Sequence, residues 1–293
     1  MRYSVRHQTR YLYSDLVSIS HNRLHSWPRV CPWQSRTNPI LTISPEPAFK
    51  NSQNDFFGNP VCFFTIQKPH RELDVVVMFE AQVTPRAKAE DRYDWQQTVE
   101  LLRRPASRET LEACQFRFDS AWVQRSTEVT DYARESFPPK RGTLEACVDF
   151  CSRIHRDFEF NNKATDVATP LAVAFQQKKG VCQDFAHLAI AGLRGLGLAA
   201  RYVSGYLRTI PPKGRERLQG ADASHAWLSV WIPEFGWVDL DPTNDCSAGQ
   251  DHITLAWGRD YHDVCPLRGV VLGGGQQVVK VGVDVLPLSA QHC

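Results

Sequence analysis

The hydrophobic pattern changes along this 293-residue chain, from the strand period of two to the spacing of one helix face. Tyr3 and Val5 begin an alternating run that continues to Tyr13, and residues 73–83 form a second β-rich run. Residues 143–158 instead place their apolar side chains at helical spacing. We therefore expect an α+β protein with a β-rich N-terminal domain over residues 1–100 and a second domain over residues 101–293.

Prolines divide the middle of the N-terminal domain. They suit edge strands and loops, so we expect short pieces of structure there. The residues are Pro28, Pro32, Pro39, Pro45 and Pro47. Residues 122–137 are a helical candidate, and residues 278–286 alternate like a strand.

Composition excludes several classes of protein. The 34 basic and 32 acidic residues give a net charge of +2, which argues against a nucleic-acid partner at the level of bulk charge. No apolar run approaches the ~18 residues of a membrane span, and the N-terminus lacks an apolar signal core. We therefore expect a cytoplasmic protein without a membrane partner. The nine cysteines contain no C-x-x-C pair, so we expect reduced thiols and no metal site.

The segment around Cys182 carries the strongest chemical signal. Residues 180–186 place this cysteine in the first turn of an amphipathic helix over residues 181–196. Unpaired backbone N–H groups and the positive end of the helix dipole meet there and favour a thiolate. A buried core thiol is the alternative interpretation.

Two predicted strands supply a base and a carboxylate. Residues 224–232 place His225 on one face of a strand, and residues 237–241 place both Asp239 and Asp241 on one face of the next. A hairpin between them brings Asp241 within a few residues of the position opposite His225. Nucleophile, base and orienting carboxylate then form a Cys–His–Asp arrangement, with Asp239 as the alternative carboxylate.

These motifs, in this order, resemble the transglutaminase-like superfamily. The family core has G-x-C on a helix, H-A-W on a strand and G-W-x-x-x-D-x-T on the next strand. The corresponding residues here are Gly180-Val181-Cys182, His225-Ala226-Trp227 and Gly236-Trp237 with Asp241-Pro242-Thr243. The N-terminal part is similar to the β-rich domain that precedes this core in many bacterial members. The matching residues there include His7, Thr9, Tyr11, Tyr13 and Phe56-Phe57-Gly58-Asn59.

The resemblance implies a papain-like catalytic core without a cofactor. Cys182 would be the nucleophile, His225 the base and Asp241 its orienting carboxylate. A carboxamide or peptide bond in a peptide or protein substrate would give a thioester. Water would then release the acyl group as in a cysteine peptidase or amidase, which we expect, or an amine would accept it as in a transglutaminase. A non-catalytic peptide-binding module on the same fold is the alternative of a different class.

Several further residues are weaker candidates. Animal transglutaminases place an indole in the oxyanion hole, but the nearest tryptophan upstream of the cysteine is Trp122, in a different segment. Gln176 lies six residues before Cys182, as the oxyanion glutamine does in papain-like proteases, and is otherwise a solvated residue. Trp227 and Trp237 either pack or line a substrate groove. The basic loop at 207–223 either flanks an anionic substrate or is simply solvated.

Overall fold

The computed structural model describes residues 1–164, 169–209 and 224–288. Within these ranges no helix is both long and apolar enough to span a membrane. Most of the basic loop predicted at 207–223 lies outside the described residues.

The N-terminal residues form a large antiparallel sheet around one long strand, β1. The order is β2-β5-β1-β4-β3, and β13 and β14 also pair with β1. The strands are β1 (Arg2–Leu24), β2 (Gln34–Ser44), β3 (Phe49–Asn54), β4 (Pro60–Ile66), β5 (His70–Val83), β13 (Leu267–Gly273) and β14 (Gln277–Pro287). Alternate residues of β1 and β5 are buried, as their period of two predicts.

The C-terminal strands do not join the sheet of the core. Val5 pairs with Val285 of β14, and Leu24 pairs with Leu267 of β13, so both strands complete the N-terminal sheet. This differs from the boundary expected from the sequence, which places residues 101–293 in one domain. Their actual place follows from backbone pairing with the first strand of the chain, which no local pattern encodes.

The other described residues form mainly helices and a second sheet, with the order β11-β10-β9-β8-β12. Its strands are β8 (Ala200–Leu207), β9 (Ser224–Ile232), β10 (Gly236–Asp241), β11 (Cys246–Ser247) and β12 (His252–Gly258). The helices are α1 (Trp95–Arg103), α2 (Arg108–Cys114), α3 (Thr127–Arg134), α4 (Thr143–Asp157), α5 (Leu171–Gln177), α6 (Cys182–Leu196) and α7 (Tyr261–Val264). The short strands β6 (Glu159–Phe160) and β7 (Lys179–Gly180) pair in parallel beside α6.

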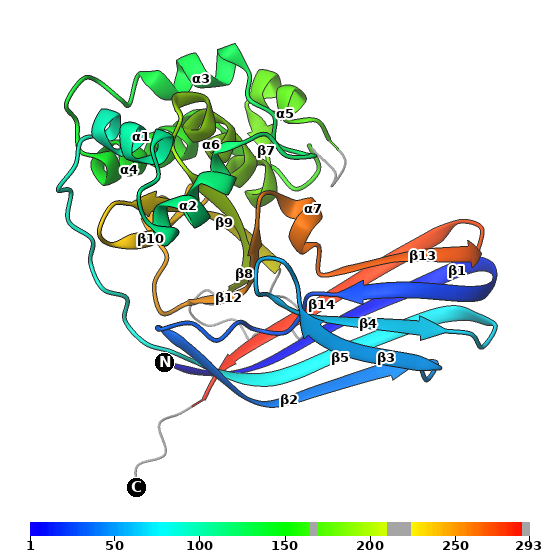
Figure 1. The fold of residues 1–293 in the computed structure, drawn as a ribbon. Helices are drawn as coiled ribbons and strands as arrows, with labels where there is room; N and C mark the ends of the chain where they lie inside the picture. Colours follow the sequence, from blue (N-terminus) through cyan, green and yellow to red (C-terminus); the bar gives the residue numbers. More distant parts are fainter. Residues whose placement is uncertain (165–168, 210–223, 289–293) are drawn as a thin grey trace, which may run out of the picture.

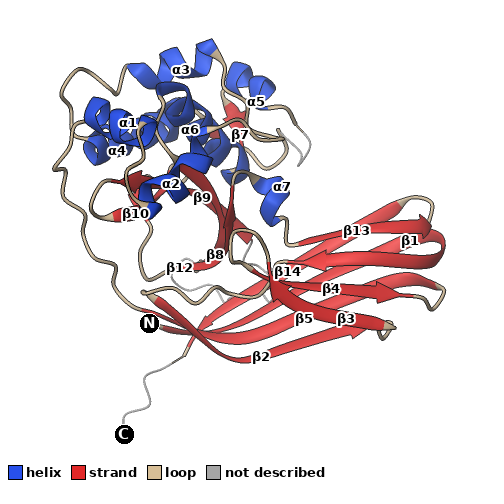
Figure 2. Ribbon diagram, in the orientation of Figure 1, coloured by secondary structure: helices blue, strands red, loops and turns tan. Residues whose placement is uncertain are grey.

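The five-stranded sheet lies between the helices and the N-terminal sheet (Figures 1 and 2). One hydrophobic cluster joins α6 to this sheet and includes Leu188, Tyr202 and Leu228. A second cluster joins the N-terminal sheet to the same strands through Tyr206 and Ile253. The middle sheet is therefore covered on both sides, which explains why nearly all of β8 is buried.

Two local predictions need correction. Pro39 does not cut the chain into short pieces, because β2 is an eleven-residue strand that runs through it. The proline is tolerated because β2 lies at the sheet edge and its register shifts between Thr37 and Ile40. The helix predicted over 122–137 is shorter: α3 starts only after Ser126, whose hydroxyl accepts the Val129 N–H.

Candidate active site

Cys182 is the first residue of α6, where the sequence placed it, and is half-buried. Asp184 Oδ2 accepts the Val181 N–H at 2.8 Å and so fixes the start of the helix. Gly180 is required by close packing, because a Cβ there would lie 2.7 Å from Asp184 Oδ2. The segment thus holds the thiol at a rigid helix N-terminus, beside the backbone N–H groups that begin the helix.

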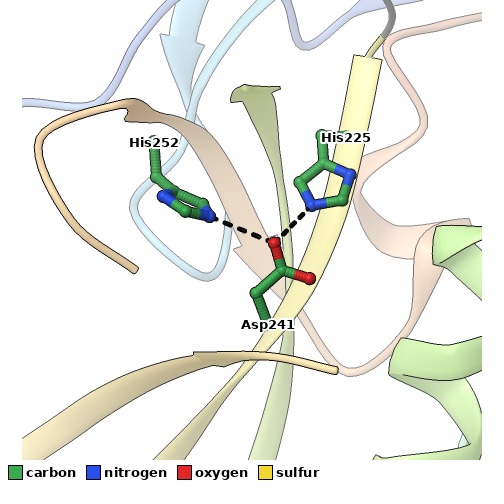
Figure 3. Close-up of side chains that lie close together, drawn as sticks. All are labelled: His225, Asp241 and His252. Atoms are coloured by element: carbon green, nitrogen blue, oxygen red, sulfur yellow. Dashed lines mark hydrogen bonds and ion pairs between the residues drawn. The ribbon is translucent and has the colours of Figure 1, made fainter. Parts of the chain in front are cut away.

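His225 and Asp241 meet on the β9–β10 hairpin, as the strand alternation predicts. Leu240 pairs with Leu228, which sets Asp241 diagonally across from His225. The imidazole Nε2 lies 2.7 Å from Asp241 Oδ2 (Figure 3). Nε2 therefore donates to the carboxylate, and Nδ1 is the nitrogen left for the thiol.

The Asp241 carboxylate is fully buried and accepts five hydrogen bonds. Oδ2 receives His225, His252 and the Asn244 side chain at 2.7, 3.1 and 2.7 Å. Oδ1 receives the backbone N–H groups of Thr243 and Asn244 at 2.9 and 3.2 Å. Burial alone would raise the pKa of this carboxyl, but the hydrogen bonds from the two imidazoles and Asn244 outweigh burial and lower it. Asp241 is held as a carboxylate.

His225 is held in its protonated form by its two neighbours. Burial by itself lowers the pKa of the imidazole. Hydrogen bonds to Asp241 and to Cys182 act in the opposite direction and prevail, and they raise the pKa to about 10. The structure thus brings all three predicted residues together, with the imidazole between the thiol and the carboxylate.

The neighbouring carboxylate, Asp239, serves a different part of the structure. Its Oδ2 accepts the Arg86 guanidinium at 2.6 Å and the Trp227 indole N–H at 3.0 Å. Burial raises the pKa of Asp239, yet the cations Arg86 and Arg201 reverse this and leave it lowered. The geometry selects Asp241 over Asp239 as the partner of His225.

The two tryptophans proposed for a substrate groove both pack against other side chains. Trp227 is fully buried, so it cannot line a groove. Its ring packs against the rings of His225 and His252. Trp237 lies near the hairpin turn, away from His225, and packs between Phe116 and the Arg201 guanidinium. Trp227 therefore has a packing role, and the groove role of Trp237 stays a prediction.

Gln176 lies on α5 and is exposed. Within the described part of the chain its side chain makes no hydrogen bond, and its role as an oxyanion donor stays a prediction. Trp122 is half-buried, with its ring against Tyr261 and His187 at centroid distances of 5.5 and 6.5 Å. It lines a cavity of about 660 Å³ that also reaches Ser224, the residue before His225.

Two residues of the network were not found from the sequence. Asn244 follows Asp241 by three residues, and the Asp-Pro-Thr-Asn run is a turn signal that could have indicated it. His252 begins β12 in a part of the chain with no informative pattern, and no sequence signal connects it to Asp241.

The cluster of His225, Asp241 and His252 is the one candidate metal site among the described residues, with ligand atoms within 4.8 Å of one another. The hydrogen-bond pattern favours N–H groups directed at the carboxylate over nitrogen lone pairs directed at a metal ion. Gly249 N–H donates to His252 Nδ1 at 3.2 Å, so Nε2 of His252 carries a hydrogen and donates to Asp241. We therefore describe it as a hydrogen-bond network.

Comparisons with known proteins agree with this architecture. A family model for the bacterial transglutaminase-like N-terminal region matches residues 3–82, and one for the transglutaminase-like superfamily core matches residues 130–242. An uncharacterized protein of Mycobacterium bovis is 40% identical over 98% of this chain and 93% of its own length. A relative from Mycobacterium leprae is 30% identical over 98% of this chain and 99% of its own.

Two further similarities concern proteins with a stated activity. A crystal structure from Cytophaga hutchinsonii, described as a "Putative Cysteine Protease", has a TM-score of 0.74 with 18% identity and covers 99% of this chain and 92% of its own. That likeness shows the fold. A protein-glutamine gamma-glutamyltransferase of Pseudomonas aeruginosa is 37% identical over 70 residues, which is 24% of this chain and 10% of that protein.

Proposed function

The chain belongs to the transglutaminase-like superfamily, and on this premise we propose that it is a thiol-dependent amide-bond enzyme with Cys182, His225 and Asp241 as its catalytic residues. The observation that carries the proposal is the imidazole of His225, which is hydrogen-bonded to both the thiol and a buried carboxylate. This is the relation of nucleophile, base and orienting group that acyl transfer uses.

The proposed reaction begins when the Cys182 sulfur attacks the carbonyl carbon of an amide. The carbonyl oxygen takes the negative charge, and the N–H groups at the start of α6 can donate to it. His225 then gives its proton to the leaving amine as the C–N bond breaks, which leaves a thioester on the sulfur. Asp241 keeps the imidazole in the orientation that serves both steps.

We propose hydrolysis as the second half-reaction. His225 removes a proton from water, the hydroxide attacks the thioester, and the thiolate leaves with release of a carboxylic acid. The shared fold over nearly the whole chain with the protein described as a "Putative Cysteine Protease" supports this order of preference. Transamidation to a primary amine is the second candidate, supported by the 70-residue match to a protein-glutamine gamma-glutamyltransferase.

Iodoacetamide labelling near neutral pH, read by peptide mass spectrometry, tests the catalytic proposal. We expect Cys182 to alkylate much faster than the other cysteines, and His225→Ala to slow it. Cys246 is an internal control, because its residue is exposed and pairs with Asp241 on the neighbouring strand. Desolvation of its sulfur and the carboxylates of Asp241 and Asp245 nevertheless raise the pKa of its thiol to about 11. Equally slow labelling of all cysteines would favour a peptide-binding module instead.

A second experiment separates water from an amine as the acceptor. A peptide library is incubated with the protein, with and without a primary amine. Cleaved or deamidated products that carry no amine support hydrolysis, whereas amine-labelled products would overturn that preference.

A further inference from the structure

The Asp241 carboxylate binds a second imidazole that the proposed reaction does not use. His252 is 4% exposed, and its Nε2 lies 3.1 Å from the same Oδ2 atom that receives His225 (Figure 3). The two histidines approach this oxygen from different strands, β9 and β12. A buried polar side chain that donates to a catalytic carboxylate calls for a functional explanation.

The surroundings of His252 fix both its tautomer and its ring position. Because Gly249 N–H donates to Nδ1, the ring hydrogen lies on Nε2 and is directed to Asp241. The ring meets the Trp227 indole edge to face at a centroid distance of 5.2 Å. Gly205 permits this packing, since a Cβ there would lie 2.4 Å from the Trp227 ring and 2.2 Å from the Ile253 carbonyl oxygen.

We propose that His252 is a positioning residue, which shares the oxygen of the Asp241 carboxylate with His225 and so limits how tightly His225 holds its proton. This inference rests on the proposed function. Two N–H donors on one oxygen fix the rotation of the carboxylate and divide its negative charge between two imidazoles. Without His252, the carboxylate would give more of its charge to His225, and the imidazole would hold its proton more tightly.

The charged and titratable groups around the pair are few. Asp241 faces His225 and His252, with the thiols of Cys151 on α4 and Cys246 on β11 farther out. His225 faces Asp241 and Cys182, and its ring centroid lies 6.1 Å from that of His252. Burial raises the pKa of Cys151 and Cys246 above that of an ordinary thiol, so neither thiol titrates near neutral pH.

The test compares His252→Phe with His252→Gln. Phenylalanine keeps the ring against Trp227 but removes the donor, whereas glutamine restores an N–H near the position of Nε2. In nitrogen-15 NMR titrations of the imidazoles, we expect His252→Phe to raise the pKa of His225 by about 0.5 and His252→Gln to return it toward the wild-type value. The alkaline limb of Cys182 alkylation by iodoacetamide should move in parallel.

A matched control is His70→Phe, which also replaces a buried histidine by phenylalanine. His70 lies on β5 of the N-terminal sheet, whereas Asp241 lies on β10 of the other sheet. It should leave both titrations unchanged. Unaltered titration of His225 in folded His252→Phe, or identical effects of Phe and Gln, would overturn the positioning role. Failure of the proposed function is a separate result, seen as unselective labelling of Cys182 in the wild-type protein, because the NMR titration needs no activity.

Discussion

Replacement of Asp241 by asparagine tests the electrostatic core of the site. Asparagine keeps the shape of the side chain, and its oxygen can still accept the backbone N–H groups of Thr243 and Asn244. Its amide nitrogen would then face three N–H donors, from His225, His252 and the Asn244 side chain. The variant removes the charge that stabilises the imidazolium and places a donor against donors.

The size of the effect follows from His225. The rise of its pKa from 6.5 to about 10 corresponds to roughly 5 kcal/mol, because one pKa unit is about 1.36 kcal/mol. Asp241 and Cys182 share this stabilisation, so the part that Asp241 contributes is on the order of 2 to 3 kcal/mol. Asp241→Asn should therefore lower the pKa of His225 by about two units, so that at a pH above both values the fraction of protein that holds the imidazolium falls about a hundredfold.

The assay is the second-order rate constant of Cys182 alkylation by iodoacetamide from pH 5 to pH 11, with thermal unfolding measured on the same samples. The midpoint pH of the alkaline limb of this rate profile, which reports the pKa of His225, should fall from about 10 toward about 8. Asp239→Asn is the matched control, because it removes a buried carboxylate two residues away that pairs with Arg86. It should lower the melting temperature without moving the limb. A folded Asp241→Asn protein with the wild-type limb would refute the reasoning.

Two further predictions concern stability. Gly205→Ala should cost about 1–3 kcal/mol in urea denaturation, because its Cβ would overlap Trp227 and the Ile253 carbonyl; unchanged stability would contradict the close packing. Burial lowers the pKa of His7 to about 4 in the folded protein. In the unfolded chain the same imidazole therefore binds a proton at a higher pH than it does in the folded protein. The neutral ring therefore contributes stability above pH 6.5 that is lost as pH falls toward 4. His7→Gln, which can still hydrogen-bond Tyr206, should reduce the stability difference between pH 7 and pH 4.5 by about 2 kcal/mol, and an equal pH dependence in both proteins would count against it.

Much of the candidate site could be predicted because its residues lie within regular elements. Strand alternation has a period of two, so it decides which face of β9 and β10 carries His225 and Asp241. The hairpin turn between Ile232 and Gly236 is short enough to fix their register. The amphipathic pattern of α6 likewise decides that Cys182 stands at a helix start.

Other features depended on contacts between distant segments. Asp239 and Asp241 share a face, and only the packing of Arg86 against Asp239 separates their roles. The burial of Trp227 depends on the close approach of β12 to β8 at Gly205. The same approach brings His252 to Asp241.

The amino-acid sequence by itself thus determined which side chains can point the same way within each helix and hairpin, because side-chain direction repeats with the local backbone. Tertiary structure alone decided that β13 and β14 complete the N-terminal sheet and that a second imidazole reaches the carboxylate. Long-range strand pairing fixes such neighbours. Its backbone hydrogen bonds are the same for every residue type, so the local sequence does not specify the partner.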